Sequence, residues 1–276
     1  MSGSNGKLST ATLGVVQETL LTPLCARADQ FGRNDPIVVD PAAAKLVSQI
    51  DYDFDRIRAY PDTLTGCAIR AAIFDSWIKE FLSVHPTGTL VLVGEGLDTT
   101  FERNDNGRAR WFELDFPDVI DLRSKLFEPS PRRQHIAGDA LEGKWIDQVR
   151  ESAGSGYLFQ AAGVLMYLKH PQVLRLFTLL ADNFPGSTFL FDCCSTMAVR
   201  NSGRWEATVR TTRARYGWGI DDPRAIQAWD RRFDVTDVRY MLDYHRSQWR
   251  WRTRFASTLS RSLRHAYQVN RSVLQQ

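Results

Sequence analysis

Glycines and acids follow apolar stretches in this sequence of 276 residues, a pattern that can bind a nucleotide. The run Leu90-Val91-Leu92-Val93 leads directly into Gly94-Glu95-Gly96. Glycines at such a turn let the backbone bend sharply and let a ligand approach with no Cβ in the way. About twenty residues later, Glu113 and Asp115 close a second apolar stretch, and an acid there can accept hydrogen bonds from both ribose hydroxyls. A tight turn alone would also explain the glycines.

A third acid narrows the ligand class. Asp139 follows the short apolar stretch Gln134–Ala137, where the edge of an adenine would lie. Thr99 occupies the position of the third glycine in dinucleotide-binding turns, which disfavours a diphosphate, and the sequence contains no P-loop pattern. A nucleoside without a diphosphate fits better, and S-adenosylmethionine is the leading candidate.

Strands alternating with helices must position these residues. The sequence predicts a helical prelude, in which Asp40 caps a helix that begins at Pro41, and then a parallel, doubly wound α/β sheet. The expected helices are 12–30, 68–82 and 173–181. The expected strands are Leu90–Val93, Arg110–Asp115, Gln134–Ala137, Tyr157–Ala161 and Thr188–Cys193, with late strands at Val238–His245 and Gln248–Phe255.

We divide the chain into four parts on this basis. Residues 1–82 form an N-terminal helical cap, and residues 83–195 form a Rossmann-like cofactor-binding core. Residues 196–236 lack a β-α rhythm and are expected to be a lid or substrate insertion. Residues 237–276 supply C-terminal strands and a helix that complete the core.

Composition excludes several protein classes. Hydrophobic residues make up 43% and charged residues 24%, which excludes disordered, collagen-like and coiled-coil chains. No apolar run is long enough to span a membrane, and no apolar signal core follows Met1–Lys7, so we expect a cytoplasmic protein. The four cysteines are too few for a disulfide scaffold, Cys193 and Cys194 are expected to be buried thiols, and we expect no metal site.

The C-terminal segment is basic. It carries seven arginines and no acid or lysine from His245 to Gln276, although the net charge of the whole chain is only +3. Such a segment is compatible with contact to nucleic acid or a membrane surface, and equally with a solvated face of a last strand and helix. Because it has no lysine and no recognised RNA-binding module, we regard nucleic acid as an unlikely partner. The sequence does not predict an oligomeric state.

An ordered set of motifs resembles the leucine carboxyl methyltransferase family, especially its bacterial branch of tetracenomycin-type polyketide O-methyltransferases. The resemblance spans about residues 12–245. The matching segments are Glu18-Thr19-Leu20-Leu21, Asp35-Pro36-Ile37-Val38, Arg70 with Phe74-Asp75, Gly94-Glu95-Gly96-Leu97-Asp98-Thr99, Glu113-Leu114-Asp115-Phe116-Pro117, Gly138-Asp139, Gly163-Val164-Leu165-Met166-Tyr167-Leu168 and Trp218-Gly219-Ile220-Asp221-Asp222.

The resemblance implies a class I methyltransferase fold with S-adenosylmethionine as methyl donor. It implies that Arg70 pairs with the carboxylate of the cofactor and that Gly94 and Gly96 line its amino-acid end. Tyr167 would lie near the transferred methyl group. The remaining cofactor contacts it implies are Asp115 at the ribose, with Glu113 as a less favoured substitute, and Asp139, Ala140 and Leu141 around the adenine.

Two positions depart from the family pattern. Members commonly have a glutamate at the position of Ala162 in the cofactor pocket, and often an arginine at that of Thr100. Gln160, two residues before Ala162 on the same strand face, is a partial substitute for the missing acid. These changes affect the substrate assignment more than the fold.

The methyl acceptor is expected to be a small molecule with an ionised carboxylate, which needs no general base. No histidine lies within the motifs, which favours a carboxylate over a phenol. Arg200 and Arg210 in the insertion would bind the acceptor, with Tyr216 and Trp218 as an aromatic wall. A phenolic acceptor and a protein C-terminal carboxylate remain alternatives.

Overall fold

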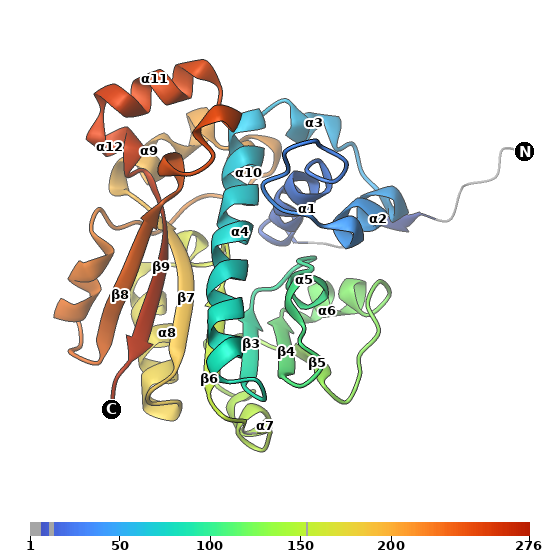
Figure 1. Cartoon of the computed structure of the whole chain (residues 1–276), viewed down its shortest axis with the longest axis vertical. Helices are drawn as coiled ribbons and strands as arrows, with labels where there is room; N and C mark the ends of the chain where they lie inside the picture. The colour runs from blue at the N-terminus through green and yellow to red at the C-terminus, as the bar shows by residue number, and fades with distance from the viewer. Residues whose placement is uncertain (1–6, 11–13, 153) are drawn as a thin grey trace, which may run out of the picture.

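A seven-stranded sheet forms the centre of the protein (Figure 1). The computed structural model describes residues 7–10, 14–152 and 154–276. The strand order is β5-β4-β3-β6-β7-β9-β8, in which β3 to β7 run parallel and β9 lies antiparallel to both of its neighbours. This confirms the predicted doubly wound α/β core. The strands are β3 (Thr89–Val93), β4 (Arg110–Asp115), β5 (Arg133–Ala137), β6 (Tyr157–Ala161), β7 (Thr188–Cys194), β8 (Phe233–Tyr240) and β9 (Tyr267–Leu274).

The parallel strands are apolar because helices cover both faces of the sheet. Leu90 and Leu92 of β3 pack toward α4 (Pro61–Val84), which crosses one face in Figure 1. Val91 and Val93 pack toward α7 (Ile146–Arg150) and α8 (His170–Asn183) on the other face. The strand order reverses between β3 and β6, and ligands of such sheets bind at the carboxyl ends of the strands beside that reversal.

The N-terminal helical region lies beside the carboxyl ends of the strands, where the glycine turn follows β3. The carboxylate of Asp40 accepts a hydrogen bond from the Ala43 backbone N–H at 2.9 Å, as the capping pattern predicted. Helix α1 packs against α2 and α4. The elements of this region are β1 (Leu8–Ser9), a 3-10 turn (Gln17–Leu20), α1 (Leu21–Ala28), α2 (Pro41–Gln49), β2 (Ile50–Asp51) and α3 (Asp55–Arg58). The expected helix over 12–30 thus divides in two, and its first two residues lie outside the described part of the chain.

Short helices connect the strands and form the segment after β7. Between strands lie α5 (Thr100–Asn104), α6 (Pro117–Arg123) and a 3-10 turn at Leu165–Tyr167. The segment after β7 contains α9 (Thr196–Trp205), α10 (Ala207–Thr211) and a 3-10 turn at Pro223–Ala228. Residues 233–236, assigned above to the insertion, already belong to β8. In the described ranges no helix combines the length and the apolarity that crossing a bilayer requires.

The predicted strand over Gln248–Phe255 is wrong. The chain forms α11 (Trp251–Leu259) and α12 (Arg261–Arg264) there, and the last element is strand β9 instead of a helix. The other late strand is only partly right, because β8 ends at Tyr240 and a 3-10 turn follows. Alternating tryptophan and arginine indicated a strand, but Trp251 and Phe255 are also one helical turn apart, and both side chains are exposed.

Candidate active site

A cavity of about 730 Å³ opens at the carboxyl ends of the parallel strands. Its walls come from the turn after β3, the ends of β4, β6 and β7, the start of α4, and the helices α10 and α11. Segments far apart in the chain therefore meet at one site. The residues that line the cavity include Arg70, Gly94, Gly96, Asp115, Ala162, Gly163, Tyr167, Asp192, Glu206, Tyr216 and Tyr267.

The glycine turn after β3 has a backbone that only glycine adopts without strain. Gly94 has φ +63°, and a Cβ there would lie 2.6 Å from Cγ2 of Val164. Gly96 has φ +56°, and its backbone N–H donates to Oδ2 of Asp115 at 2.8 Å. The turn is therefore tied directly to the tip of β4.

Asp115 is held in place by backbone donors. Its Oδ1 accepts the N–H of Phe116 at 2.7 Å, while Oδ2 accepts that of Gly96. Burial raises the pKa of Asp115, and these two hydrogen bonds partly offset the rise. A carboxylate oxygen accepts more than one hydrogen bond, so this fixed group can also bind hydroxyls in the cavity.

A buried ion pair forms another part of the cavity wall. Nη1 of Arg70 donates to Asp192 at 2.9 Å, and the Gly163 backbone N–H donates to the same carboxylate at 2.6 Å. Gly163 has φ +74°, and a Cβ there would lie 2.7 Å from Nη1 of Arg70. Although burial lowers the pKa of Arg70, the charge of Asp192 raises it, so the guanidinium stays positive. The cavity thus contains a permanent cation with further N–H groups able to bind an anion.

Tyrosines and one glutamate line the side of the cavity beneath α10. The rings of Tyr167 and Tyr216 meet edge-to-face at 5.3 Å. Burial raises the pKa of Tyr167 to about 12. The hydroxyl of Tyr267 donates to Oε1 of Glu206 at 2.5 Å. This region offers aromatic surface together with a few polar groups, which suits a small apolar acceptor.

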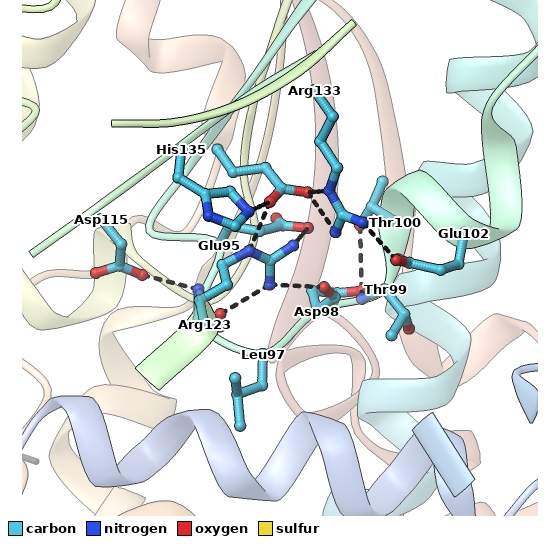
Figure 2. Close-up of polar contacts among 12 residues, drawn as sticks. Glu95, Leu97, Asp98, Thr99, Thr100, Glu102, Asp115, Arg123, Arg133 and His135 are labelled. Carbon is cyan, nitrogen blue, oxygen red and sulfur yellow. Dashed lines mark hydrogen bonds and ion pairs between the residues drawn. The ribbon is translucent and has the colours of Figure 1, made fainter. Parts of the chain in front are cut away.

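A buried network of charges supports the glycine turn (Figure 2). Glu113 accepts hydrogen bonds from Arg123 at 2.7 Å and Arg133 at 2.9 Å, and lies 3.0 Å from His135. Nη1 of Arg123 donates to the carbonyl oxygens of Gly96 and Asp98, both at 2.9 Å. Burial would raise the pKa of Glu113, but the charge of Arg123 and the hydrogen bonds hold it well below its usual range.

The comparisons with known proteins agree with this geometry. The family model described as "Leucine carboxyl methyltransferase" matches residues 21–181. The chain belongs to this family. It is 31% identical over 220 residues to the tetracenomycin polyketide synthesis O-methyltransferase TcmP of Streptomyces glaucescens, covering 79% of this chain and 80% of that protein. It is 27% identical over 247 residues to the S-adenosyl-L-methionine-dependent methyltransferase dpfgK of Gibberella zeae, covering 82% and 83%.

A solved structure shows the same fold. The crystal structure of a proposed methyltransferase from Thermobifida fusca superposes with a TM-score of 0.59 at 17% identity, covering 99% of this chain and 97% of that one. The protein is thus an S-adenosylmethionine-dependent methyltransferase with a class I fold. When bound, S-adenosylmethionine supplies an electrophilic methyl group on a sulfonium.

The residues of this family member fit an amino acid joined to a nucleoside. Arg70 places a cation in the cavity, which would suit a carboxylate, and Asp115 presents an acid, which would suit a ribose. Between them, the close approach of Gly94 to Val164 leaves no room for a side chain. No group of three metal-binding side chains is found in the described part of the chain.

Of the other residues expected to bind the cofactor, one lines the cavity and the rest lie outside its lining. Ala162 lines the cavity, and β7 brings the carboxylate of Asp192 to its neighbour Gly163. Glu113 is fully buried and does not line the cavity. Asp139, Ala140 and Leu141 also lie outside the lining, although the N–H of Gly138 donates to the carbonyl oxygen of Asp115 at 2.9 Å, which keeps this turn beside β4.

Among the four expected acceptor-binding residues, only Tyr216 lines the cavity. Arg200 and Arg210 are exposed, and the guanidinium of Arg210 lies over the ring of Tyr60. Trp218 is buried in the core against Trp229, since the segment it belongs to packs under the sheet.

Sequence reasoning missed Asp192, Glu206 and Tyr267, all of which line the cavity. An acid inside the otherwise apolar strand β7 was a signal for Asp192. Nothing in the sequence pattern distinguished Glu206 from the other polar residues of the insertion. Tyr267 lies on a strand that was not predicted.

Proposed function

We propose that this methyltransferase transfers a methyl group to an oxygen atom of a small, polyketide-like acceptor. The observation that carries the proposal is the aromatic and mostly apolar surface beside Tyr167 and Tyr216, in the same cavity as Arg70 and Asp115. The relative TcmP is a polyketide O-methyltransferase, which supports the same acceptor class.

The contacts proposed for the cofactor follow from this arrangement. Arg70 would bind its carboxylate, the turn of Gly94 and Gly96 would lie along its amino-acid end, and Asp115 would bind the ribose. The adenine would extend toward Asp139, because the turn after β5 is hydrogen-bonded to the tip of β4. Tyr167 would lie beside the acceptor.

The chain's contribution to the rate is mainly positional. Methyl transfer is an in-line displacement, and orientation of two bound reactants can contribute roughly 7–11 kcal/mol. The helices α10 and α11 close the cavity on the acceptor side and would limit the access of water. The acceptor oxygen belongs to a carboxylate, as the sequence suggested, or to a hydroxyl.

The test is methyl-labelled S-adenosylmethionine with an extract of small metabolites. We expect label in small apolar products, and mild base separates labile esters from stable ethers. Absence of labelled small molecules, in a protein that binds S-adenosylhomocysteine by calorimetry, would overturn the proposed function.

A further inference from the structure

We propose that the outer face of helix α11 is a docking site for an anionic membrane surface, on which the protein lies without crossing it. The inference goes beyond the proposed function, because binding to lipid needs neither the cofactor nor the acceptor. Two features of the helix carry it: an exposed apolar stripe, and exposed arginines on both sides of that stripe.

The apolar stripe of α11 consists of Trp251, Phe255 and Leu259, which are 68%, 62% and 72% exposed. They follow one another at intervals of four residues, so their side chains lie one above the other on a single helix face. The helix itself lies at the outer end of the molecule, at the top of Figure 1. Burial of such large apolar side chains against a partner is favourable, and their grouping on one face marks an interaction site.

The opposite face of α11 is bound to the protein. Its residues Thr253, Ala256 and Ser257 line the cavity. The Thr253 hydroxyl donates to one carboxylate oxygen of Asp62 at 2.6 Å, and the backbone N–H of Arg250 donates to the other at 3.1 Å. These bonds join α11 to the start of α4, so the helix cannot turn its stripe inward without breaking them.

Arginines without an acidic partner flank the stripe. At about 100° per residue, Arg252 and Arg254 lie on opposite sides of it. Two of the seven arginines of the basic segment form ion pairs, Arg264 with Asp243 and Arg271 with Glu80. The other five are exposed and have no ion-pair partner in the described part of the chain: Arg246, Arg250, Arg252, Arg254 and Arg261.

A lipid surface suits this helix better than a second copy of the chain or another protein. Helix α11 has nine residues and is about 13 Å long, whereas a stable protein interface uses about 20–30 residues from each side. Two copies that met through α11 would also bring two unpaired basic segments together, which is unfavourable. Tryptophan, phenylalanine and leucine on one helix face with arginines beside them are typical of helices that lie in the headgroup region of a bilayer, where anionic lipids attract the arginines.

Docking through α11 would place the cavity beside the bilayer, because the inner face of the same helix lines the cavity. An apolar acceptor dissolved in the lipid would then have a short path to the site. This consequence rests on the proposed function, whereas the docking itself does not.

The experiment is cosedimentation of the whole chain with vesicles of phosphatidylcholine and phosphatidylserine, and with vesicles of phosphatidylcholine alone. We expect binding to the anionic vesicles that weakens as the salt concentration rises, and binding to the neutral vesicles that is about tenfold weaker or more.

A double variant and a matched control test the apolar stripe. Phe255→Ser with Leu259→Ser should lower the affinity for anionic vesicles about tenfold or more, because less apolar surface enters the headgroup region. Phe31→Ser with Val84→Ser also removes one exposed phenylalanine and one exposed aliphatic side chain, but from elsewhere on the surface, and should bind as the wild type does. Neither Phe255 nor Leu259 lines the cavity, so their variant should keep the wild-type affinity for S-adenosylhomocysteine, which verifies its fold.

The arginines are tested in the same way. Arg252→Gln with Arg254→Gln should lower the affinity for anionic vesicles about tenfold or more, since each arginine near such a surface contributes about fivefold. Its affinity for neutral vesicles should not change. The control is Arg108→Gln with Arg110→Gln, two exposed arginines at the start of β4, and it should bind as the wild type does.

Trp251 reports the contact directly. Among the tryptophans whose side chains the structure describes, Trp251 alone is exposed. We expect the tryptophan emission to move to shorter wavelength on anionic vesicles, because the indole ring leaves water for the headgroup region. Trp251→Phe should abolish this shift while most of the binding remains.

Several results would overturn the inference. Absence of binding to anionic vesicles would refute the docking, and an equal loss in the Phe255/Leu259 variant and its control would move the contact away from α11. A dimer in analytical ultracentrifugation that the Phe255/Leu259 variant dissociates would assign the stripe to a second copy of the chain instead. Binding to vesicles without methyl transfer to any small molecule would count against the proposed function alone.

Discussion

Arg70 and Asp192 form a 2.9 Å ion pair that joins α4 to β7 at the wall of the cavity. The side chain of Asp192 is 1% exposed and that of Arg70 is 11% exposed. Because the guanidinium is buried, this partner is needed to offset the cost of removing its charge from water. The pair therefore serves stability, while the remaining N–H groups of Arg70 are available to a ligand.

We expect Asp192→Ala to lower the free energy of unfolding by about 3–5 kcal/mol, because it leaves a buried charge unpaired. Urea denaturation without cofactor measures this. Asp147→Ala, which removes an exposed partner of Arg150, is the control and should cost less than about 1 kcal/mol. Equal, small losses in both variants would show that Arg70 is solvated.

Asp115→Ala should weaken S-adenosylhomocysteine binding by about tenfold or more, since a lost charge-assisted hydrogen bond costs about 1.5–3 kcal/mol. Asp115→Asn keeps an acceptor oxygen and should lose less. Calorimetry measures both, with the exposed Asp121→Ala as control. Unchanged affinity in Asp115→Ala would remove the ribose contact from this position.

Gly94→Ala should destabilise the protein both by a steric clash and by backbone strain, and a control variant can separate the two effects. A Cβ added at position 94 would lie 2.6 Å from Val164, on a backbone of positive φ. A Cβ added at Gly107, where φ is +75°, would have no heavy atom within 4 Å. We expect Gly107→Ala to cost about 1–2 kcal/mol from backbone strain alone, and Gly94→Ala to cost more and also to lower cofactor affinity. Equal unfolding free energies in the two variants, together with unchanged cofactor affinity in Gly94→Ala, would contradict the close approach of Gly94 to Val164.

The Glu113 network should make the fold sensitive to acid. The Glu113 carboxyl has a pKa in the folded state well below its ordinary value of 4.5. Its contribution to the free energy of unfolding is therefore complete above pH 4.5 and is lost as the pH falls toward the pKa of the folded state. Glu113→Gln should lose about 3–5 kcal/mol at pH 7, because buried Arg123 and Arg133 then lose the carboxylate that they share.

The measurement for Glu113 is the urea midpoint of wild type and variant from pH 7 to pH 3. The gap between them should narrow below about pH 4.5. Glu128→Gln provides an exposed control. A gap that stays constant with pH would mean that Glu113 does not change its proton affinity on folding.

Local patterns predicted the parts of the site that follow strands directly. The glycine turn and Asp115 were predictable because each follows an apolar strand, and parallel strands bring their carboxyl ends to one edge. Glu113 was ambiguous, since strand alternation gives it the same face as Asp115; only the packing of Arg123 and Arg133 against it shows that it lies outside the cavity.

Residues from distant segments were not predictable in this way. Glu206 and Tyr267 meet through a hydrogen bond between positions 61 residues apart, which no periodicity encodes. The α11 sequence predicted the wrong element, because its tryptophan–arginine alternation is compatible with both a strand and a helix, and tertiary packing decides between them.

Tyr167→Phe tests whether the tyrosine hydroxyl takes part in proton transfer. Burial raises its pKa to about 12, so the hydroxyl stays protonated over the usual assay range and donates hydrogen bonds instead of accepting protons. We expect the variant to lose at most about tenfold in kcat, the effect of one neutral hydrogen bond. The pH profile between pH 6 and pH 10 should keep its wild-type shape. A loss above 100-fold, or a changed pH profile, would instead assign a proton-transferring role to the Tyr167 hydroxyl.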